Sequence, residues 1–335
     1  MAGPITAGSR PLGVSVMPLE TRREAILHIA TTADRLGYEA FFLPETWAHD
    51  TTVRLAEVAT RTQRIRFGSG ILGVWGRSAA TLAMAASTLN AMSGGRFILG
   101  LGASTQQLAE GLHDVPWDAP VKQIRKVVTQ VRALLKGERI PLAGSTGARP
   151  LRLNLPPAPN LPIYLAGLAD ETVRLAGELA DGWLPFLYPR DRLGTGVALM
   201  KEGASRTSDP DRLPLIYPTV PTVVADNPAE ARQGAAWFLA FYLTTMGPLY
   251  ARTLGRGGFE KDVKAIVAAN PTRDSAVVPP EAETLLEQLT IFGTPEQCRA
   301  RLGPWYAAGA ALPILFLRPN LTPQEIDFTL GAFRP

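Results

Sequence analysis

Cysteine and histidine are scarce in this sequence of 335 residues. It has one cysteine, Cys298, and three histidines, His28, His49 and His113. A single cysteine cannot form an internal disulfide, and we expect it to be a small buried hydrophobic residue in a helix. The histidines lack a paired spacing such as HxxxH, and the cysteine has no CxxC partner, so a zinc or iron site is disfavoured. We therefore predict no metal.

An excess of charge of one sign is also absent. Lysine and arginine total 34 against 30 acidic residues, a net charge of +4 that is scattered along the chain. Such a balance disfavours a nucleic-acid track or a membrane-binding face. No run reaches the ~18 apolar residues that span a bilayer, and the opening MAGPITAGSRPLG lacks the apolar segment of a secretory signal. We expect a cytoplasmic protein with no nucleic-acid or membrane partner.

Two common catalytic signatures are missing as well. The sequence has neither the GxSxG elbow of α/β-hydrolases nor the GxxxxGK[ST] loop of P-loop proteins. The segment 100–105, GLGAST, begins like a dinucleotide fingerprint but has Thr105 in place of the third glycine. A lone GxG is weak evidence, so neither hydrolysis nor classical dinucleotide binding has local support.

What is present is a regular alternation of short apolar runs with amphipathic helices. Hydrophobic residues make up 46% of the chain and charged residues 19%, which is typical of globular proteins. Helix signals include capping-box pairs at Thr21/Glu24, Thr294/Gln297 and Thr322/Glu325. An apolar helical stripe runs from Val121 to Leu135 and ends at Gly137. The predicted strands are 12–18, 38–45, 65–72, 96–102, 161–167, 182–188, 213–225 and 311–317.

Eight strand–helix units favour an α/β fold of the (β/α)8 TIM-barrel type. The alternative, a doubly wound sheet, more often has five to seven strands and a detectable switch point. We predict a single barrel domain over residues 1–335. The Pro- and Gly-rich stretch of about 138–160 is predicted to be a hairpin-like insertion, and about 240–290 a second insertion near the active face.

The carboxyl ends of barrel strands carry function in this fold. In this sequence they consist mostly of glycine and small apolar residues, with few groups suited to acid–base chemistry. Such a site suits a flat cofactor whose own ring performs the reaction. The residues at the ends of strands two to five are Glu45, Thr46, Trp47 and His49; Gly70, Ile71 and Leu72; Gly102, Ala103 and Ser104; and Ala166, Gly167 and Leu168.

Two segments carry a family resemblance. SGILGVWGRSAATLAMAASTLNAMSGGRFILGLGAS (69–104) resembles the core signature of the bacterial luciferase-like flavin and F420 oxidoreductases. PIYLAGLADETVRLAGELADGWLP (162–185) resembles the fifth strand, helix and sixth strand of that family. The resemblance implies a TIM barrel, usually a homodimer, that binds FMN or the deazaflavin coenzyme F420. Within the family, the sequence looks nearer to the F420-dependent members.

The resemblance also implies roles for individual residues. Gly70-Ile71 matches a non-prolyl cis peptide that backs the cofactor ring in many relatives; the alternative is an ordinary strand end. Leu72 would back the ring as well, and Gly102, Ala103 and Ser104 would line it. The turn Ala166, Gly167, Leu168 and Ala169 precedes a helix whose N–H groups would bind the cofactor phosphate, unless it is a plain tight turn.

Five residues are candidates for the chemistry. Glu45 matches a usually acidic position near the cofactor, or else forms a rim ion pair with an arginine. Trp75 and Arg77 are plausible pocket residues, unless they pack at a dimer surface. Thr46 stands where F420-dependent sugar-phosphate dehydrogenases have a histidine, and their acidic proton donor is replaced by Ser104 or Thr105, so their substrate does not transfer. His49 is a candidate proton shuttle, or a solvated loop residue beside Asp50.

These observations predict an F420-dependent oxidoreductase that transfers a hydride between F420 and a small organic substrate. Phe186 and Tyr188, with Trp75, would shape the substrate side. One alternative is an FMN-dependent monooxygenase served by a separate reductase that supplies reduced flavin. Another is a non-catalytic flavin-binding protein.

Overall fold

The computed structural model describes residues 10–142, 144, 147–272 and 275–334. These residues form two compact units. Unit 1 contains the described residues of 39–184 and 198–215, and unit 2 those of 10–38, 185–197 and 216–334. Both units are built from parallel strands and helices, and each is described by itself.

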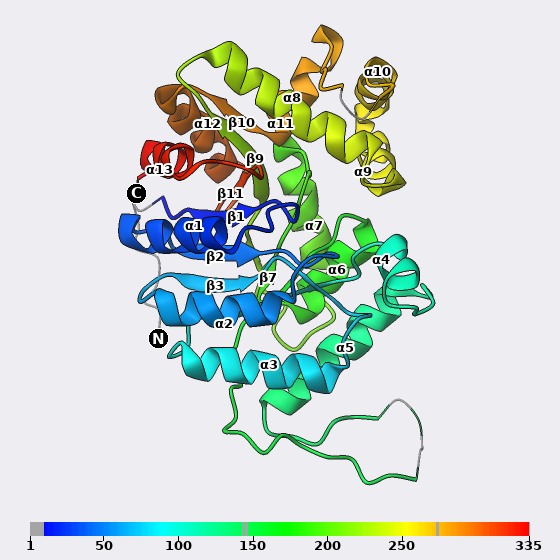
Figure 1. The fold of residues 1–335 in the computed structure, drawn as a ribbon. Coiled ribbons are helices and arrows are strands. Elements are labelled where there is room, and N and C mark those ends of the chain that lie inside the picture. The colour runs from blue at the N-terminus through cyan, green and yellow to red at the C-terminus, as the bar shows by residue number, and fades with distance from the viewer. Residues whose placement is uncertain (1–9, 143, 145–146, 273–274, 335) are drawn as a thin grey trace. The chain divides into compact units, whose positions relative to one another are not determined.

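Unit 1 contains a parallel sheet in the order β2-β3-β5-β6-β7, with β4 paired to β5. Helix α2 packs beside α3, and α3 beside α5, as Figure 1 shows. The elements are β2 (Ala40–Leu43), α2 (Thr51–Arg61), β3 (Arg66–Ser69), β4 (Leu72–Gly73), α3 (Ala79–Met92), β5 (Phe97–Gly102), α4 (Gln106–Gly111), α5 (Pro120–Leu135), β6 (Ile163–Leu165), α6 (Asp170–Leu179) and β7 (Gly182–Trp183). Helix α7 (Leu193–Ala204) and strand β8 (Leu215–Ile216) contain residues of both units.

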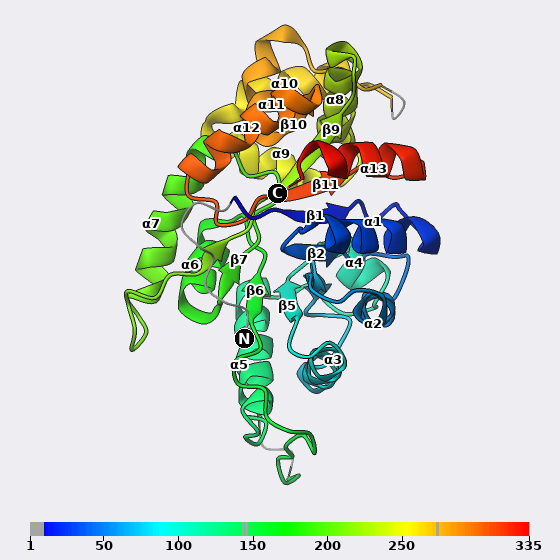
Figure 2. The ribbon, with the colours of Figure 1, turned by 90° about the vertical axis from the view of Figure 1, so that its left-hand side faces the viewer.

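Unit 2 contains a parallel sheet in the order β1-β11-β9-β10. Helix α1 packs beside α13, and α12 against β10 (Figure 2). The elements are β1 (Gly13–Val16), α1 (Arg23–Leu36), β9 (Thr219–Val224), α8 (Pro228–Thr244), α9 (Pro248–Leu254), a π-helical turn (Gly255–Phe259), α10 (Glu260–Ala269), α11 (Glu283–Leu289), β10 (Ile291–Gly293), α12 (Pro295–Ala307), β11 (Ile314–Leu317) and α13 (Pro323–Ala332). Short 3-10 turns lie at Arg190–Arg192 and Pro280–Ala282.

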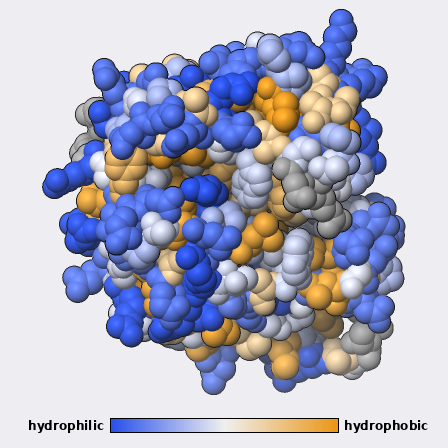
Figure 3. All heavy atoms as spheres, turned by 45° about the horizontal axis from the view of Figure 1, so that its top comes forward, coloured by the Kyte–Doolittle hydropathy of each residue, from blue (hydrophilic) through white to orange (hydrophobic). Residues whose placement is uncertain are grey.

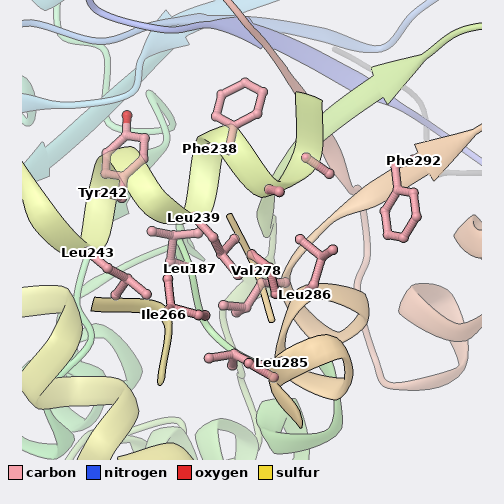
Figure 4. Close-up of a cluster of buried hydrophobic side chains, with 14 of the residues drawn as sticks. Leu187, Phe238, Leu239, Tyr242, Leu243, Ile266, Val278, Leu285, Leu286 and Phe292 are labelled. Carbon is pink, nitrogen blue, oxygen red and sulfur yellow. The ribbon is translucent and has the colours of Figure 1, made fainter. Parts of the chain in front are cut away.

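Most strand residues are buried, as expected for parallel sheets covered by helices. Every residue of β1, β2, β5 and β11 is buried. In unit 2, α8 contributes Phe238, Leu239 and Tyr242 to a hydrophobic cluster with Leu286 of α11 and Phe292 of β10 (Figure 4). On the face drawn in Figure 3, hydrophobic residues are interspersed with hydrophilic ones. No helix among the described residues has both the length and the apolar character needed to cross a membrane.

All eight predicted strands exist, with boundaries trimmed by tertiary packing. The run 213–225 is divided at Tyr217 and Pro218 into β8 and β9. Strand β10 was not predicted, because three residues are too few to show the alternation of side chains by which a strand is recognised in a sequence. The predicted apolar stripe, which includes Ile124, forms the buried face of α5. Gly137 follows this helix with a φ of +80°. Within the described part of 138–160, Ile140 N–H donates to Leu151 O at 2.8 Å, linking the two sides of the segment.

Two of the three predicted capping boxes are confirmed, at Thr294/Gln297 and Thr322/Glu325. The third was wrong, because α1 begins at Arg23 with Arg22 as its N-cap and no side-chain capping hydrogen bond. Glu20 makes a different contact there: it accepts hydrogen bonds from the backbone and side chain of Arg22. Cys298 is fully buried as predicted, and burial raises the pKa of its thiol to about 12 against the opposing effect of Arg301 and Arg299.

Candidate functional site

Most of the predicted site residues lie in unit 1, at or just after the carboxyl ends of β2, β3, β5 and β6. These strands are neighbours and run parallel. Their carboxyl ends therefore meet at one edge, which is where α/β proteins place ligands. We call this the strand-end edge.

The Gly70-Ile71 peptide at this edge is cis, as the resemblance implied. Hydrogen bonds join it to β2: Gly70 N–H donates to Leu43 O at 2.9 Å, and Glu45 N–H donates to Ile71 O at 3.3 Å. Leu72 follows in β4 and is fully buried. The cis peptide is thus held directly beside Glu45.

Gly102 brings three strand ends together. A Cβ atom on this residue would lie 3.1 Å from Ile71 Cδ1 and 3.3 Å from Ala166 Cβ, so Ile71, Gly102 and Ala166 are close neighbours. Small residues keep side chains away from this part of the edge. Gly102 therefore packs closely against Ile71 and Ala166, and an edge built of such small groups suits the flat ring of a flavin or deazaflavin.

Glu45 and Arg77 form the main polar feature of the site. The guanidinium pairs with both carboxylate oxygens of Glu45, at 2.7 Å for Nη2 to Oε1, and Nη2 also lies 2.8 Å from Asp50 Oδ2. Glu45 and Arg77 are 13% and 15% exposed, so the pair is largely removed from water. Of the two alternatives for Glu45, the structure shows the ion pair with an arginine.

The same carboxylates hold the start of α2. Asp50 is the N-cap and accepts from the backbone N–H groups of Thr52 and Val53, and Glu45 Oε1 accepts from Thr51 N–H at 3.4 Å. Burial alone would raise the pKa of Asp50, but hydrogen bonds from Thr52 and Arg77 outweigh it and hold the pKa below its usual value. Burial opposes the charge of Arg77, yet Glu45 and Asp50 together raise its pKa.

Trp75 is anchored at its polar end. Its indole N–H donates to Ala103 O at 2.8 Å, and its ring lies against Trp117 with centroids 5.3 Å apart. Ser104 follows Ala103 in a left-handed conformation, with φ +63°. Trp75 thereby links the segment after β4 to the segment after β5.

A pocket open to solvent lies among these segments. It brings together five of the predicted residues: Glu45, Thr46, Trp75, Arg77 and Ser104. Five further lining residues were missed: Gly73, Gly76, Leu108, Ala109 and His113. The two glycines were within reach of the sequence, since they flank Trp75 in GVWGRS. The other three lie in or just after α4, a short helix that the sequence analysis did not predict.

The other predicted site residues do not line this pocket. They include Gly70, Ile71 and Leu72, Gly102 and Ala103, and the Ala166–Ala169 turn, as well as His49, Phe186 and Tyr188. His49 is half-buried in the segment before α2 and is not a lining residue. Phe186 belongs to unit 2, where it packs edge-on against Tyr242, Tyr250 and Phe316 at centroid distances of 4.8, 5.6 and 5.1 Å. Tyr188, also in unit 2, is buried.

The turn Ala166–Ala169 ends directly before α6, which begins at Asp170. Ala169 is the N-cap and makes no side-chain capping bond, while Gly167 O accepts from the Trp183 indole at 2.9 Å. The first N–H groups of a helix have no partner within the helix and favour anions. Here the first turn also carries the exposed carboxylates Asp170 and Glu171, which oppose an anionic ligand.

In the part of the chain that the structure describes, no group of three or more His, Cys, Asp or Glu side chains is arranged to hold a metal ion. The site is therefore described by its carboxylates, one arginine, one histidine and its aromatic walls.

Known proteins share this fold. The whole-chain likeness to the F420-dependent tetrahydromethanopterin reductase of Methanopyrus kandleri has a TM-score of 0.78 over 98% of each chain, at 18% identity. The FMN-bound oxygenating component of 3,6-diketocamphane monooxygenase from Pseudomonas putida matches with a TM-score of 0.73 over 97% of each chain, at 17% identity. The fold class is the predicted α/β TIM barrel.

Residues 9–312 match the family model described as luciferase-like monooxygenase. A putative coenzyme F420-dependent oxidoreductase of Mycobacterium tuberculosis is 30% identical over 313 residues, which cover 86% of this chain and 89% of that protein. The chain belongs to the luciferase-like monooxygenase family, and it is an oxidoreductase of the F420- or flavin-dependent kind.

Proposed function

We propose that this chain is an F420-dependent oxidoreductase that transfers a hydride between F420 and a small organic substrate. The observation that carries the proposal is the strand-end edge, where the small residues Gly102 and Ala166 pack beside Ile71 of the cis peptide. The nearby Glu45 and Arg77 are tied to each other. Such an edge accommodates a ring and leaves the redox step to it. The 30% identical relative, named for F420, supports this cofactor over FMN.

F420, when bound, supplies hydride transfer at its ring. The chain's own residues position it: Gly70, Ile71 and Leu72 back the ring, and Gly102, Ala103 and Ser104 line it. The Ala166–Ala169 turn binds the phosphate through its N–H groups against the opposing charge of Asp170 and Glu171. Arg77, which is also paired with Asp50, holds Glu45 in place, and Trp75 forms one wall of the pocket.

The test is a titration of the purified protein with F420 and, separately, with FMN, followed by fluorescence. We expect micromolar or tighter binding of F420 and much weaker binding of FMN. The reverse preference would favour an FMN-dependent monooxygenase with a separate reductase, which the FMN-bound neighbour makes the second candidate. Binding of neither cofactor below ~100 μM would end both proposals. Tight binding without turnover of any acceptor would favour a non-catalytic flavin-binding protein.

A substitution tests the strand-end edge. Ala166→Leu adds bulk beside Gly102, and we expect it to raise the dissociation constant for F420 at least tenfold with an unchanged circular dichroism spectrum. Ala268→Leu is the matched control, because Ala268 is exposed on α10 in unit 2. Equal F420 affinity in the two variants would show that the ring does not lie against Ala166.

The single-domain organisation, the insertions at about 138–160 and 240–290, the homodimer and the cytoplasmic location remain predictions. Light scattering during size-exclusion chromatography will decide the oligomeric state.

A further inference from the structure

The pocket in unit 1 contains three ionisable lining residues, Glu45, Arg77 and His113. Glu45 and Arg77 neutralise each other, and Asp50 adds a second carboxylate to the same guanidinium. No positive charge of Arg77 is therefore left to bind an anionic substrate. The walls add an indole from Trp75 and apolar groups from Leu108 and Ala109, which suit an uncharged ligand.

His113 is held in a defined position by Gly76. A Cβ atom on Gly76 would lie 2.6, 2.8 and 2.9 Å from Cε1, Nε2 and Nδ1 of His113. Because three ring atoms are almost equally distant from that one point, the imidazole lies flat against the glycine. Gly76 is not in a left-handed conformation, so its lack of a side chain serves this close approach. His113 lines the pocket and is itself exposed to solvent.

We propose that this pocket receives an uncharged carbonyl compound as the hydride acceptor and that His113 is the catalytic residue that donates the accompanying proton. This inference rests on the proposed function. The carbonyl carbon takes the hydride from the reduced F420, and a new C–H bond forms. The electron pair of the C=O π bond moves to oxygen, and oxygen takes the proton from the imidazolium as the N–H bond breaks. The carbonyl is reduced to an alcohol, the cofactor is oxidised, and His113 regains its proton from solvent.

Several charged groups face or neighbour the imidazole. Glu45 and Arg77 line the same pocket and are paired with each other. Glu110 lies on α4, where its carboxylate accepts from Trp117 N–H and the Gln106 side chain, and Asp114 follows His113 in the chain. Histidine is the side chain whose ordinary ionisation falls between pH 5 and 8. Carbonyl reduction needs the protonated form of the donor, so with His113 in that role kcat/KM should fall as the pH rises.

The first experiment uses the small number of histidines. Protein labelled with 13C at histidine Cε1 gives three resonances, assigned with His28→Gln, His49→Gln and His113→Gln. At pH 8, with and without F420, we add cyclohexanone or its anionic analogue 4-oxocyclohexane-1-carboxylate. We expect cyclohexanone to shift the His113 resonance and leave that of His28 in unit 2 unchanged, and the anion to need at least tenfold higher concentration. An equal or stronger response to the anion, or no response to either probe, overturns the proposal.

The second experiment measures oxidation of reduced F420 by cyclohexanone from pH 5 to 9. We expect His113→Gln to lower kcat at least tenfold and to lose the wild-type protein's fall of kcat/KM with pH, while the KM for F420 is unchanged. The cofactor's own ionisation is common to both proteins and cancels in the comparison. Gly76→Ala should lower kcat as well, because it displaces the ring, and His28→Gln should match wild type. Parallel pH profiles in wild type and His113→Gln overturn the proton-donor role.

The two proposals fail differently. If F420 binds tightly but the His113 resonance and pH profile do not respond, the acceptor site is wrong and the F420-dependent function stands. If F420 does not bind, the proposed function itself fails.

Discussion

At the scale of single residues, Gly100 shows how closely two strands of unit 1 approach. A Cβ atom on Gly100 would lie 1.9 Å from the backbone oxygen of Ser69, a distance that no side chain tolerates. The Ser69 hydroxyl also donates to Gly100 O at 2.8 Å and accepts from Gly100 N–H at 2.9 Å. The absence of a side chain at this position is therefore a requirement of the sheet.

Gly100→Ala should lower the free energy of unfolding by about 3 kcal/mol, because backbone must move to admit one methyl group. Urea unfolding followed by circular dichroism measures the change. The same substitution at Gly331 of α13, where a Cβ meets nothing within 4 Å, is the control and should raise the free energy of unfolding by up to about 1 kcal/mol. Similar effects at the two sites would contradict the assigned close approach.

The candidate site was predictable residue by residue, but its contacts were not. The sequence pointed to Glu45, Trp75 and Arg77 because they follow strands that a parallel sheet aligns. The ion pair joins residues that are 32 positions apart, so it depends on where two loops meet. His113 had no local signal, since only the packing of α4 brings its ring to Gly76.

At the scale of elements, capping chemistry decides where the last two helices begin. Thr322 Oγ1 accepts from Glu325 N–H at 3.2 Å, and Glu325 Oε2 accepts from Thr322 N–H at 2.8 Å. The backbone hydrogen bond from Thr322 is the main cause that holds the pKa of Glu325 below its usual value, against the effect of burial. This cap is therefore sensitive to acid.

Thr322→Ala should lower the free energy of unfolding by about 1 kcal/mol at pH 7. Because the folded-state pKa of Glu325 is depressed, the stabilisation is present above its usual pKa and is lost as the pH falls through the folded value. The cost of the substitution should therefore shrink at pH 3. Thr88→Ala, on the exposed side of α3, is the matched control and should show no such pH dependence. A cost at pH 3 as large as at pH 7 would show that the hydrogen bond from the Thr322 hydroxyl to the Glu325 carboxylate does not stabilise the cap.

At the scale of the whole molecule, several carboxylates respond to acid in the same direction. Glu20, Asp50, Glu178 and Glu325 all have lowered pKa values. Burial would raise the pKa of Glu20, but hydrogen bonds from Arg22 and Asn320 outweigh it. The folded chain therefore binds fewer protons than the unfolded chain near pH 4, and stability decreases as the pH falls.

We expect the melting temperature to be nearly constant from pH 7 to 5 and to fall below pH 4.5, the ordinary pKa of a glutamate. Calorimetry at a series of pH values measures this. Glu20→Gln removes one of the responsible carboxylates, so the melting temperature should fall less steeply below pH 4.5. Glu281→Gln, at an exposed site, should leave this fall unchanged. A melting temperature that stays constant down to pH 3 would contradict the assigned pKa directions.

The sequence by itself determined the alternation of eight strands with helices and two of the three capping boxes. These depend on local periodicity and short-range hydrogen bonds, which the order of residues encodes directly. Its resemblance to a family also located the cis peptide at Gly70-Ile71. The tertiary structure alone decided that Glu45 pairs with Arg77, that Trp75 reaches Ala103, and that His113 lies on Gly76. These contacts join distant segments, and their geometry follows from how the chain packs around its core.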